Sequence, residues 1–403
     1  MDISVGGTPD TKNNDYWNGS IPWLSVKDFN SCSRYVYTTA KSITQEGLIN
    51  SATKLLEKDD LIISARGTVG SLAMIPFSMA YNQSCYGLRA KEEFVSPSYL
   101  FYLLKCKVAA LLKNSHGSVF DTITIDTFSN IKVELPSKEE QEKVSRLLCD
   151  IDDKIECNNR LNDNLHSQMK ILYNYWFTQF DFPNNIGNPY RSSGGAMTKH
   201  CRLSYPIPSD WSVCTLLNNP LANIIKPGVK KFNSKYYLAT SDVNGTEISP
   251  VSVIDYDTRE NRANMQPTEN SVWFAKMKKS NKHLYLNGNM ANLINNTILS
   301  TGFCGFQCSD VSFEYMASFI EYSYFEKLKD ILAHGATQEA VNNEDLSNIP
   351  LVIPPENLLR LYHERTKEIY EQISNNLCEN QQLIKLRNWL LPMLMNGQAT
   401  IAD

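Results

Sequence analysis

An internal repeat constrains the fold of this 403-residue chain more than any other feature of its sequence. Residues 116–131 and residues 334–349 both begin with His-Gly and both end with Ser-Asn-Ile, at an offset of 218 positions. The same offset relates Gly87 to Gly305, and matches at this offset persist over more than seventy residues. Agreement over so long a stretch of sequence indicates two copies of one structural plan.

Each copy opens with a region that predicts a mixed α/β domain. Short apolar and β-branched runs, such as residues 61–65 and 271–275, are separated by Gly, Asn and Ser. Runs of this kind bounded by turn-forming residues predict strands.

A short strand and a long helix are expected to follow each domain. The strands are predicted at residues 133–136 and 351–355, each containing or ending at proline. Segments without Gly or Pro then predict helices over about residues 137–180 and 356–391. Between the two copies, residues 181–210 are rich in Asn, Pro, Gly and Ser, which predicts a linker.

Both predicted helices carry a heptad pattern of the kind found in coiled coils. The first seam consists of Val144, Leu148, Ile151, Ile155, Asn158, Asn162, Leu165, Met169, Leu172 and Trp176. The second, at the same offset, consists of Tyr362, Thr366, Ile369, Ile373, Asn376, Asn380, Leu383, Arg387, Leu390 and Leu394. A simpler interpretation is that each amphipathic helix packs only on its own domain.

The asparagines at the centre of each seam favour pairing of the two helices. In an antiparallel pair, Asn158 faces Asn380 and Asn162 faces Asn376. A parallel pair would also align them, but the linker is too short to return along a helix of about 60 Å, at about 1.5 Å per residue. Buried Asn in a seam costs stability and fixes register. We therefore interpret the helix pair as a ruler between two domains.

The expected fold class is α+β. Two α/β domains related by a pseudo-twofold axis are joined by two long antiparallel coiled-coil helices. The expected boundaries are a first domain at residues 1–136, a helix at 137–180, a linker at 181–210, a second domain at 211–354 and a second helix at 355–398.

Motifs of common enzymes are absent from the sequence. No G-x-x-x-x-G-K-[ST] phosphate loop occurs, and the ten cysteines and six histidines form no zinc-binding pattern. We therefore assign no catalytic and no metal-ligating residues. The sequence has no long apolar run and no signal peptide, so we expect a cytoplasmic protein without membrane contact.

The net charge of −4 means that any binding to nucleic acid must use local basic patches. Several glycine-containing or lysine-rich segments between predicted strands are candidates. Each could instead be a solvated surface loop, but basic loops at matching places in two tethered domains suit phosphate contact and groove reading better. The candidate DNA-binding residues are Arg66, Thr68, Lys27, Lys230, Lys231, Lys276, Lys278, Lys279 and Lys282.

The chain resembles the specificity subunits of type I restriction–modification systems over almost its whole length. A specific part of this resemblance is a helix opening with Pro-x-x-Glu-Glu-Gln in a duplicated plan. The matching segments are Gly-Gly-Thr-Pro at residues 6–9, Ile-Pro-Trp-Leu at 21–24, Ala-Arg-Gly-Thr-Val-Gly at 65–70 and Leu-Pro-Ser-Lys-Glu-Glu-Gln at 135–141.

The resemblance implies that each α/β region is a target-recognition domain that reads one half of a split, asymmetric site in double-stranded DNA. The helices would be spacers on which two methyltransferase subunits dock, and restriction subunits would join the assembly. S-adenosylmethionine, ATP and magnesium would be bound by those partners. The family usually has a segment like residues 210–216 before its first recognition domain too, and we expect the first domain here to lack it.

Two other kinds of function remain open from the sequence. One is a stand-alone DNA-binding regulatory module that recruits no methyltransferase, and the other is a coiled-coil scaffold that binds no nucleic acid. Methyltransferase and helicase–nuclease genes beside this one would favour the specificity-subunit interpretation over both alternatives. The sequence does not give the DNA site or its spacer length, because base readout depends on a few loop side chains.

Overall fold

A computed structural model describes residues 1–403 except 30–32, 115–121, 249–251, 337 and 402–403. The chain divides into two compact units. Unit 1 comprises Met1–Cys157 and Gln382–Asp403, and unit 2 comprises Asn158–Gln381. The His-Gly start of the first repeat, at residues 116–117, lies outside the described residues. Within the described part, no helix is both long and apolar enough to cross a membrane.

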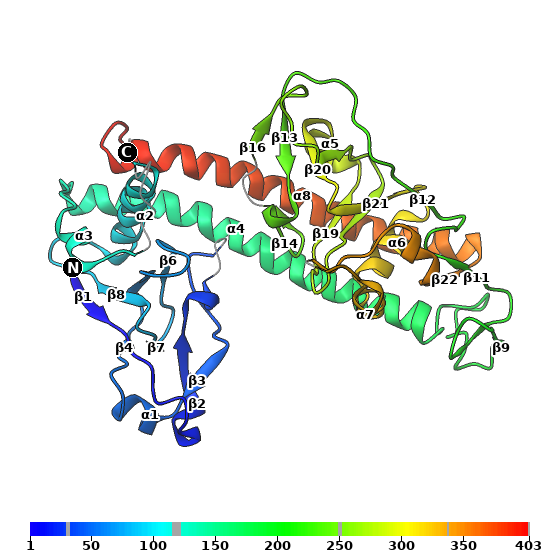
Figure 1. The fold of residues 1–403 in the computed structure, drawn as a ribbon, viewed down its shortest axis with the longest axis horizontal. Coiled ribbons are helices and arrows are strands. Elements are labelled where there is room, and N and C mark those ends of the chain that lie inside the picture. The colour runs from blue at the N-terminus through cyan, green and yellow to red at the C-terminus, as the bar shows by residue number, and fades with distance from the viewer. Residues whose placement is uncertain (30–32, 115–121, 249–251, 337, 402–403) are drawn as a thin grey trace. The chain divides into compact units, whose positions relative to one another are not determined.

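Unit 1 contains two four-stranded sheets, drawn blue to cyan in Figure 1. All neighbouring strands of the first sheet are antiparallel, whereas the two central strands of the second are parallel. The first sheet has the order β1 (Asp2–Val5), β8 (Cys85–Arg89), β5 (Leu61–Ser64) and β6 (Leu72–Met74). The second has the order β3 (Lys41–Ile43), β2 (Trp17–Leu24), β7 (Met79–Tyr81) and β4 (Leu55–Leu56).

Unit 2 contains two four-stranded sheets with the same strand directions. The first has the order β12 (Ala222–Ile224), β21 (Phe303–Cys308), β18 (Ser271–Ala275) and β19 (His283–Leu286). The second has the order β16 (Ser252–Ile254), β13 (Lys235–Leu238), β20 (Thr297–Ser300) and β17 (Ala263–Met265). Two-stranded sheets pair β9 (Met197–Lys199) with β10 (Pro206–Pro208), β11 (Ser212–Thr215) with β22 (Pro350–Ile353), and β14 (Val243–Asn244) with β15 (Glu247–Ile248).

The order of strands along the chain and within the four-stranded sheets is the same in both units, which confirms the duplicated plan. The repeated glycines occupy equivalent places in it. Gly87 lies opposite Ile62 of β5, and Gly305 lies opposite Trp273 of β18. A Cβ at Gly305 would lie 2.4 Å from the Trp273 ring, so only glycine fits beside this large side chain.

The helices complete the two cores. Unit 1 has α1 (Gln45–Ile49), α2 (Pro97–Asn114) and α3 (Ile125–Ser129), and unit 2 has α5 (Ala291–Asn296), α6 (Phe313–Glu321) and α7 (Ser323–Leu332). The long helices are α4 (Lys138–Tyr173), continued by a π-helical turn (Asn174–Thr178), and α8 (Glu356–Met395). Short 3-10 turns are η1 (Asn14–Tyr16), η2 (Val26–Asp28), η4 (Thr240–Asp242), η5 (Gly288–Met290) and η6 (Glu344–Asn348).

The start of α4 explains the Pro-Ser-Lys-Glu-Glu-Gln motif. The Ser137 backbone N–H donates to the Glu140 carboxylate (3.1 Å), and the Glu140 N–H donates to the Ser137 hydroxyl (3.3 Å), which together form a capping box. The buried Gln141 side chain donates to the carbonyls of Phe94 (2.9 Å) and Pro136 (3.1 Å). The motif therefore both begins the helix and fixes it to its domain.

The two long helices run antiparallel, as the heptad pattern predicts. Within unit 1, Arg387 of α8 pairs with Asp152 of α4. Within unit 2, Asn380 contacts Asn158 and Asn376 contacts Asn162, so residue numbers fall along α8 as they rise along α4. Every predicted seam position is buried or partly buried.

One prediction about the connecting segments needs correction. Residues 133–136 form no strand, whereas Pro350–Ile353, which corresponds to residues 132–135, forms β22, because β22 has an antiparallel partner in β11. The predicted linker at 181–210 carries β9 and β10. Its Phe182 ring stacks on Tyr190 (4.7 Å between centroids) and on Trp211 (5.2 Å), which holds the segment against the core of unit 2.

Candidate nucleic-acid interface

In unit 1, the candidate residues Arg66 and Thr68 lie on the turn that joins β5 to β6. Gly67 (φ +81°) and Gly70 (φ +84°) adopt left-handed backbone conformations that glycine tolerates best. The Gly70 N–H donates to the Ser64 carbonyl (2.9 Å), and the Ser64 hydroxyl donates to the Thr68 carbonyl, so the turn is closed internally. Arg66 and Thr68 are exposed on this rigid turn.

Lys27 lies beside that turn, on η2 at the end of β2. The η2 turn is capped by Asp28, which accepts the Ser25 N–H (2.7 Å). A Cβ built on Gly67 would lie 3.6 Å from a methyl carbon of Val26, so the η2 turn and the β5–β6 turn adjoin. The structure thus brings Lys27 and Arg66, which are 39 positions apart in the chain, onto neighbouring exposed turns.

In unit 2, the lysine-rich segment occupies the topologically equivalent place, between β18 and β19. This segment, residues 276–282, is called the β18–β19 loop below, and it carries Lys276, Lys278, Lys279 and Lys282. The Lys282 ammonium donates to the carbonyl of Thr240 in η4 (2.5 Å), and η4 follows β13 as η2 follows β2. Asp242 caps η4 by accepting the Ala239 N–H (2.9 Å). Both units therefore place the same two turns side by side.

The β18–β19 loop is less positive than its own sequence indicates. Its segment contains no acid, but Glu339 pairs with Lys278 (2.9 Å), and Asp330 of α7 accepts the backbone N–H of Lys279 (2.8 Å). The Lys279 side chain is exposed, whereas those of Lys276, Lys278 and Lys282 are partly covered. Lys279 is consequently the loop lysine best placed to reach a ligand.

Lys230 and Lys231 lie on a different segment of unit 2, between β12 and β13, and both are exposed. Lys235, which follows them at the start of β13, is partly buried beside the Phe232 ring (5.7 Å), and burial lowers the pKa of its ammonium. No hydrogen bond or ion pair found among the described residues joins this segment to the β18–β19 loop.

The four asparagines form two polar layers in unit 2. The Asn158 amide donates to the Asn380 carbonyl oxygen (2.9 Å), and the Asn376 amide donates to that of Asn162 (2.7 Å). The Asn380 amide also donates to Asn159 (2.6 Å). These are the pairs expected from an antiparallel seam, and their role in fixing register stays a prediction.

Comparison with known proteins shows where this arrangement occurs. The family model described as "Type I restriction modification DNA specificity domain" matches residues 1–167. The type I restriction enzyme MjaIX specificity subunit of Methanocaldococcus jannaschii is 25% identical, covering 100% of this chain and 92% of that protein. The chain is similar to the type I restriction enzyme specificity subunits. This finding confirms the resemblance noted in the sequence.

A second specificity subunit of this kind comes from a bacterium. The HindI specificity subunit of Haemophilus influenzae is 21% identical, covering 77% of this chain and 79% of that protein. Among solved structures, a type I restriction–modification S subunit from M. genitalium has 13% identity and a TM-score of 0.45, covering 96% of this chain and 99% of that one.

The structure of this specificity-subunit relative also contains a loop-positioning residue that sequence reasoning missed. Lys329 of α7 is fully buried and donates to the carbonyls of Ser280 (2.6 Å) and Ala275 (3.4 Å), so it joins the end of β18 to the interior of the β18–β19 loop. Glu326 pairs with Lys329 (2.6 Å) and with His283 (2.8 Å). In the sequence, Glu326 and Lys329 look like an ordinary surface pair at helical spacing, so nothing there marked them as buried.

Proposed function

We propose that this chain is the DNA-recognition subunit of a type I restriction–modification complex. Each unit reads one half of a bipartite, asymmetric site in double-stranded DNA. The observation that carries the proposal is the repetition of two adjoining exposed turns at equivalent places in both units. In unit 1 these turns carry Lys27, Arg66 and Thr68, and in unit 2 they include the β18–β19 loop with Lys279.

This arrangement suits the two tasks of a DNA reader. Exposed lysine and arginine attract phosphates, and the glycines of the β5–β6 turn allow the backbone to approach a groove closely. The two turns differ in sequence between the units. Because base readout depends on the identity of a few side chains, each unit is expected to recognise a different half-site.

The long helices are proposed to dock the partner subunits. Each unit exposes large apolar side chains on these helices, including Trp389 (59% exposed) in unit 1 and Ile171 (71% exposed) in unit 2. Leu386 (43% exposed) lies three positions before Trp389 on α8, so the two are neighbours on one face, and contiguous exposed apolar surface favours protein–protein contact. The proposal assigns two methyltransferase subunits to these surfaces and restriction subunits to the larger assembly. S-adenosylmethionine, ATP and magnesium then act in those partners, and the chain itself has no catalytic role.

The deciding experiment is co-expression with the cognate methyltransferase, followed by sequencing of methylated adenines. We expect one split recognition sequence whose two halves respond to different variants. Arg66→Ala together with Thr68→Val should impair or alter recognition of one half-site only. Lys279→Ala should affect recognition of the other half-site. Lys58→Ala is a matched control in unit 1, because Lys58 is exposed at the opposite end of β5 from the β5–β6 turn.

Two results would overturn the proposal. Binding of a specific duplex without methyltransferase recruitment would support a stand-alone DNA-binding module instead. Absence of DNA binding, with the helices still capturing a partner, would support a coiled-coil scaffold.

A further inference from the structure

The tip of the β18–β19 loop in unit 2 has a strained backbone. Lys279 adopts a left-handed conformation (φ +58°), which crowds the Cβ of a non-glycine residue against the backbone. Among the described residues, four other non-glycine residues have positive φ. Three of them are Asn or Asp, which tolerate this conformation, and the fourth, Phe180, is buried. Lys279 is exposed, so its strain persists only if neighbouring groups hold the backbone.

Two successive residues of α7 hold this tip. The Asp330 carboxylate accepts the Lys279 backbone N–H (2.8 Å), and the Lys329 ammonium donates to the Ser280 carbonyl (2.6 Å). One bond lies before the Cα of the strained residue and the other lies after it. Together they fix the backbone on both sides of Lys279.

Lys329 is fixed in turn by a buried ion pair. Its side chain is 0% exposed, and Glu326, one turn earlier in α7, pairs with it (2.6 Å). The other carboxylate oxygen of Glu326 contacts His283 at the start of β19 (2.8 Å). A buried ammonium is costly unless it is paired and hydrogen-bonded, and here it is both. Because Lys329 does not reach the surface, any effect it has on a ligand must pass through the loop.

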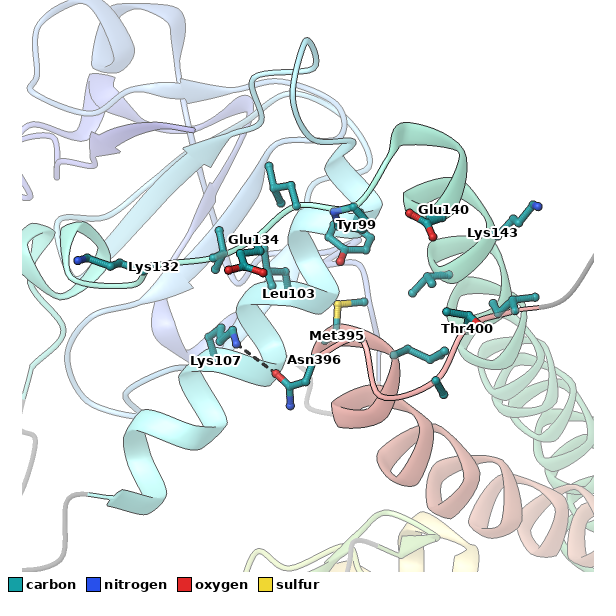
Figure 2. A pocket seen from close by; sticks show the side chains of 18 residues that line it. Tyr99, Leu103, Lys107, Lys132, Glu134, Glu140, Lys143, Met395, Asn396 and Thr400 are labelled. Carbon is teal, nitrogen blue, oxygen red and sulfur yellow. Dashed lines mark hydrogen bonds between the residues drawn. The ribbon is translucent and has the colours of Figure 1, made fainter.

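The β5–β6 turn of unit 1 is held differently. Gly67 adopts its left-handed conformation without strain, and the turn closes on itself through the bond from Gly70 to Ser64. A cavity of about 740 Å³ does occur in unit 1, between α2, the start of α4 and the end of α8 (Figure 2). Neither Arg66 nor Thr68 lines it. Exposed turns have no cavity wall to place their side chains, so the backbone must place them.

We propose that α7 is a clamp that pre-organises Lys279 for contact with a DNA phosphate. Asp330 and Lys329 are its positioning residues, and Glu326 fixes Lys329. A lysine ammonium binds phosphate as a point charge, and a side chain whose backbone is already ordered loses less conformational freedom on binding. The clamp rests on the proposed function and deepens it, because it assigns residues that act on DNA binding without touching DNA.

Two substitutions of Asp330 separate the clamp from its charge. Asp330→Asn and Asp330→Ala both remove one negative charge near the loop, but only asparagine keeps a side-chain oxygen that can accept the Lys279 N–H. Fluorescence anisotropy with the full chain and a duplex that contains the methylated site compares them. Asp330→Ala should bind about three- to tenfold more weakly than Asp330→Asn. Amide exchange of residues 277–282 should be faster in Asp330→Ala.

The buried half of the clamp is tested by Lys329→Met combined with Glu326→Gln, which leaves the net charge unchanged and no buried charge unpaired. Its slope of log affinity against log salt concentration should fall by about 0.9, the effect of one lost phosphate contact. This loss should disappear when Lys279→Ala is already present, because the clamp acts through that side chain. Lys327→Met, on the exposed side of α7, is the control and should leave exchange of the loop unchanged.

Two results would overturn the clamp while the proposed function stands. One is equal affinity of the Asp330→Asn and Asp330→Ala variants for a duplex that the parent chain binds. The other is an equal loss from the buried double variant with and without Lys279→Ala, which would indicate a general loss of stability. A parent chain that binds no duplex would instead overturn the proposed function, and the clamp with it.

Discussion

At the scale of single residues, the charge that the β18–β19 loop offers to a ligand is set by residues outside it. Glu339 neutralises Lys278 in an ion pair that is about half exposed at the carboxylate. Asp330 binds a backbone N–H of the same loop and places a second negative charge nearby. The loop together with these two acids therefore carries less net positive charge than its four lysines alone.

Removal of the Glu339 charge should strengthen DNA binding by unit 2. In Glu339→Gln, Lys278 is released to contact phosphate, and one phosphate contact adds about 0.9 to the slope of log affinity against log salt concentration. Fluorescence anisotropy with a duplex that contains the methylated site should show tighter binding and a steeper slope. Glu344→Gln makes the same change of charge at an exposed position of η6. Equal effects of both variants would contradict a role for Lys278.

Buried thiols should make stability fall at alkaline pH. Burial raises the pKa of the Cys304 thiol from an ordinary 9.0 to about 12. The unfolded chain therefore loses this proton above about pH 9, while the folded chain keeps it until about pH 12. The contribution of the buried thiol to the free energy of unfolding is fully present below pH 9. It falls by up to about 1.4 kcal/mol per pH unit through this window.

Urea unfolding at several values between pH 8 and pH 10.5 measures this effect. Cys304→Ala lacks the thiol, so its free energy of unfolding should decline less steeply than that of the parent chain. Other titrating groups contribute equally to both curves. Parallel curves would show that the thiol does not titrate differently in the two states.

At the scale of elements, the seam of the helix pair contains two further polar residues, Thr366 and Arg387, and both are buried. The Thr366 hydroxyl donates to the Tyr362 carbonyl of its own helix (2.7 Å). Arg387 pairs with Asp152 (2.5 Å), whose other oxygen accepts the Tyr102 hydroxyl (2.7 Å). Polar groups are tolerated at these seam positions because each has a hydrogen-bond partner.

The asparagine layers should respond to single and paired changes in opposite ways. Asn162→Ala leaves the buried Asn376 amide without its acceptor and should cost about 1–3 kcal/mol. Asn162→Leu combined with Asn376→Leu removes both buried amides together, and the exposed Gln372 that donates to Asn376 can bind water instead, so the double variant should recover most of that loss. Thermal and urea unfolding provide the measurement. Asn164→Ala is the control, because Asn164 is exposed on the same helix.

The paired leucine variant also tests the register itself. If the asparagines fix register, it should recover stability but populate shifted pairings of the helices. Cysteines introduced at facing seam positions would then cross-link out of register as well as in register. Unchanged, unique cross-linking would show that the remaining seam residues are sufficient.

At the scale of the whole molecule, the proposed ruler can be tested by changing its length. The observed pairs indicate where a matched insertion belongs: Asn158 faces Asn380, so an insertion after Ile155 must be matched by one before Leu383. An insertion near Ile373 would instead displace the asparagine layers. A matched heptad adds about 10 Å, at about 1.5 Å per residue.

Methylome sequencing should show the non-specific spacer lengthened by about three base pairs, each about 3.4 Å, with both half-sites unchanged. An insertion in α4 alone should break the asparagine contacts and destabilise the protein. Retained modification with an unchanged spacer would show that another part of the complex fixes the distance.

The amino-acid sequence was enough to predict the duplicated plan, the long helices and their antiparallel pairing. Repeats and heptads are periodic, and periodic patterns report directly which side chains must be buried. The β5–β6 turn and the β18–β19 loop can be matched in the sequence because each follows a similar apolar run, at residues 61–65 and 271–275. The expected DNA-binding roles of Arg66 and Lys279 stay predictions.

Features that depend on partners far apart in the chain could be found only in the folded protein. Residues 132–135 and 350–353 occupy equivalent places in the repeat, but a strand exists only where a second segment supplies backbone hydrogen bonds, and β11 does so in unit 2 alone among the described residues. The burial of Lys329 and the neutralisation of Lys278 by Glu339 likewise join residues that are far apart in the chain. Such contacts leave no local pattern, because their energy comes from neighbours that only folding brings together.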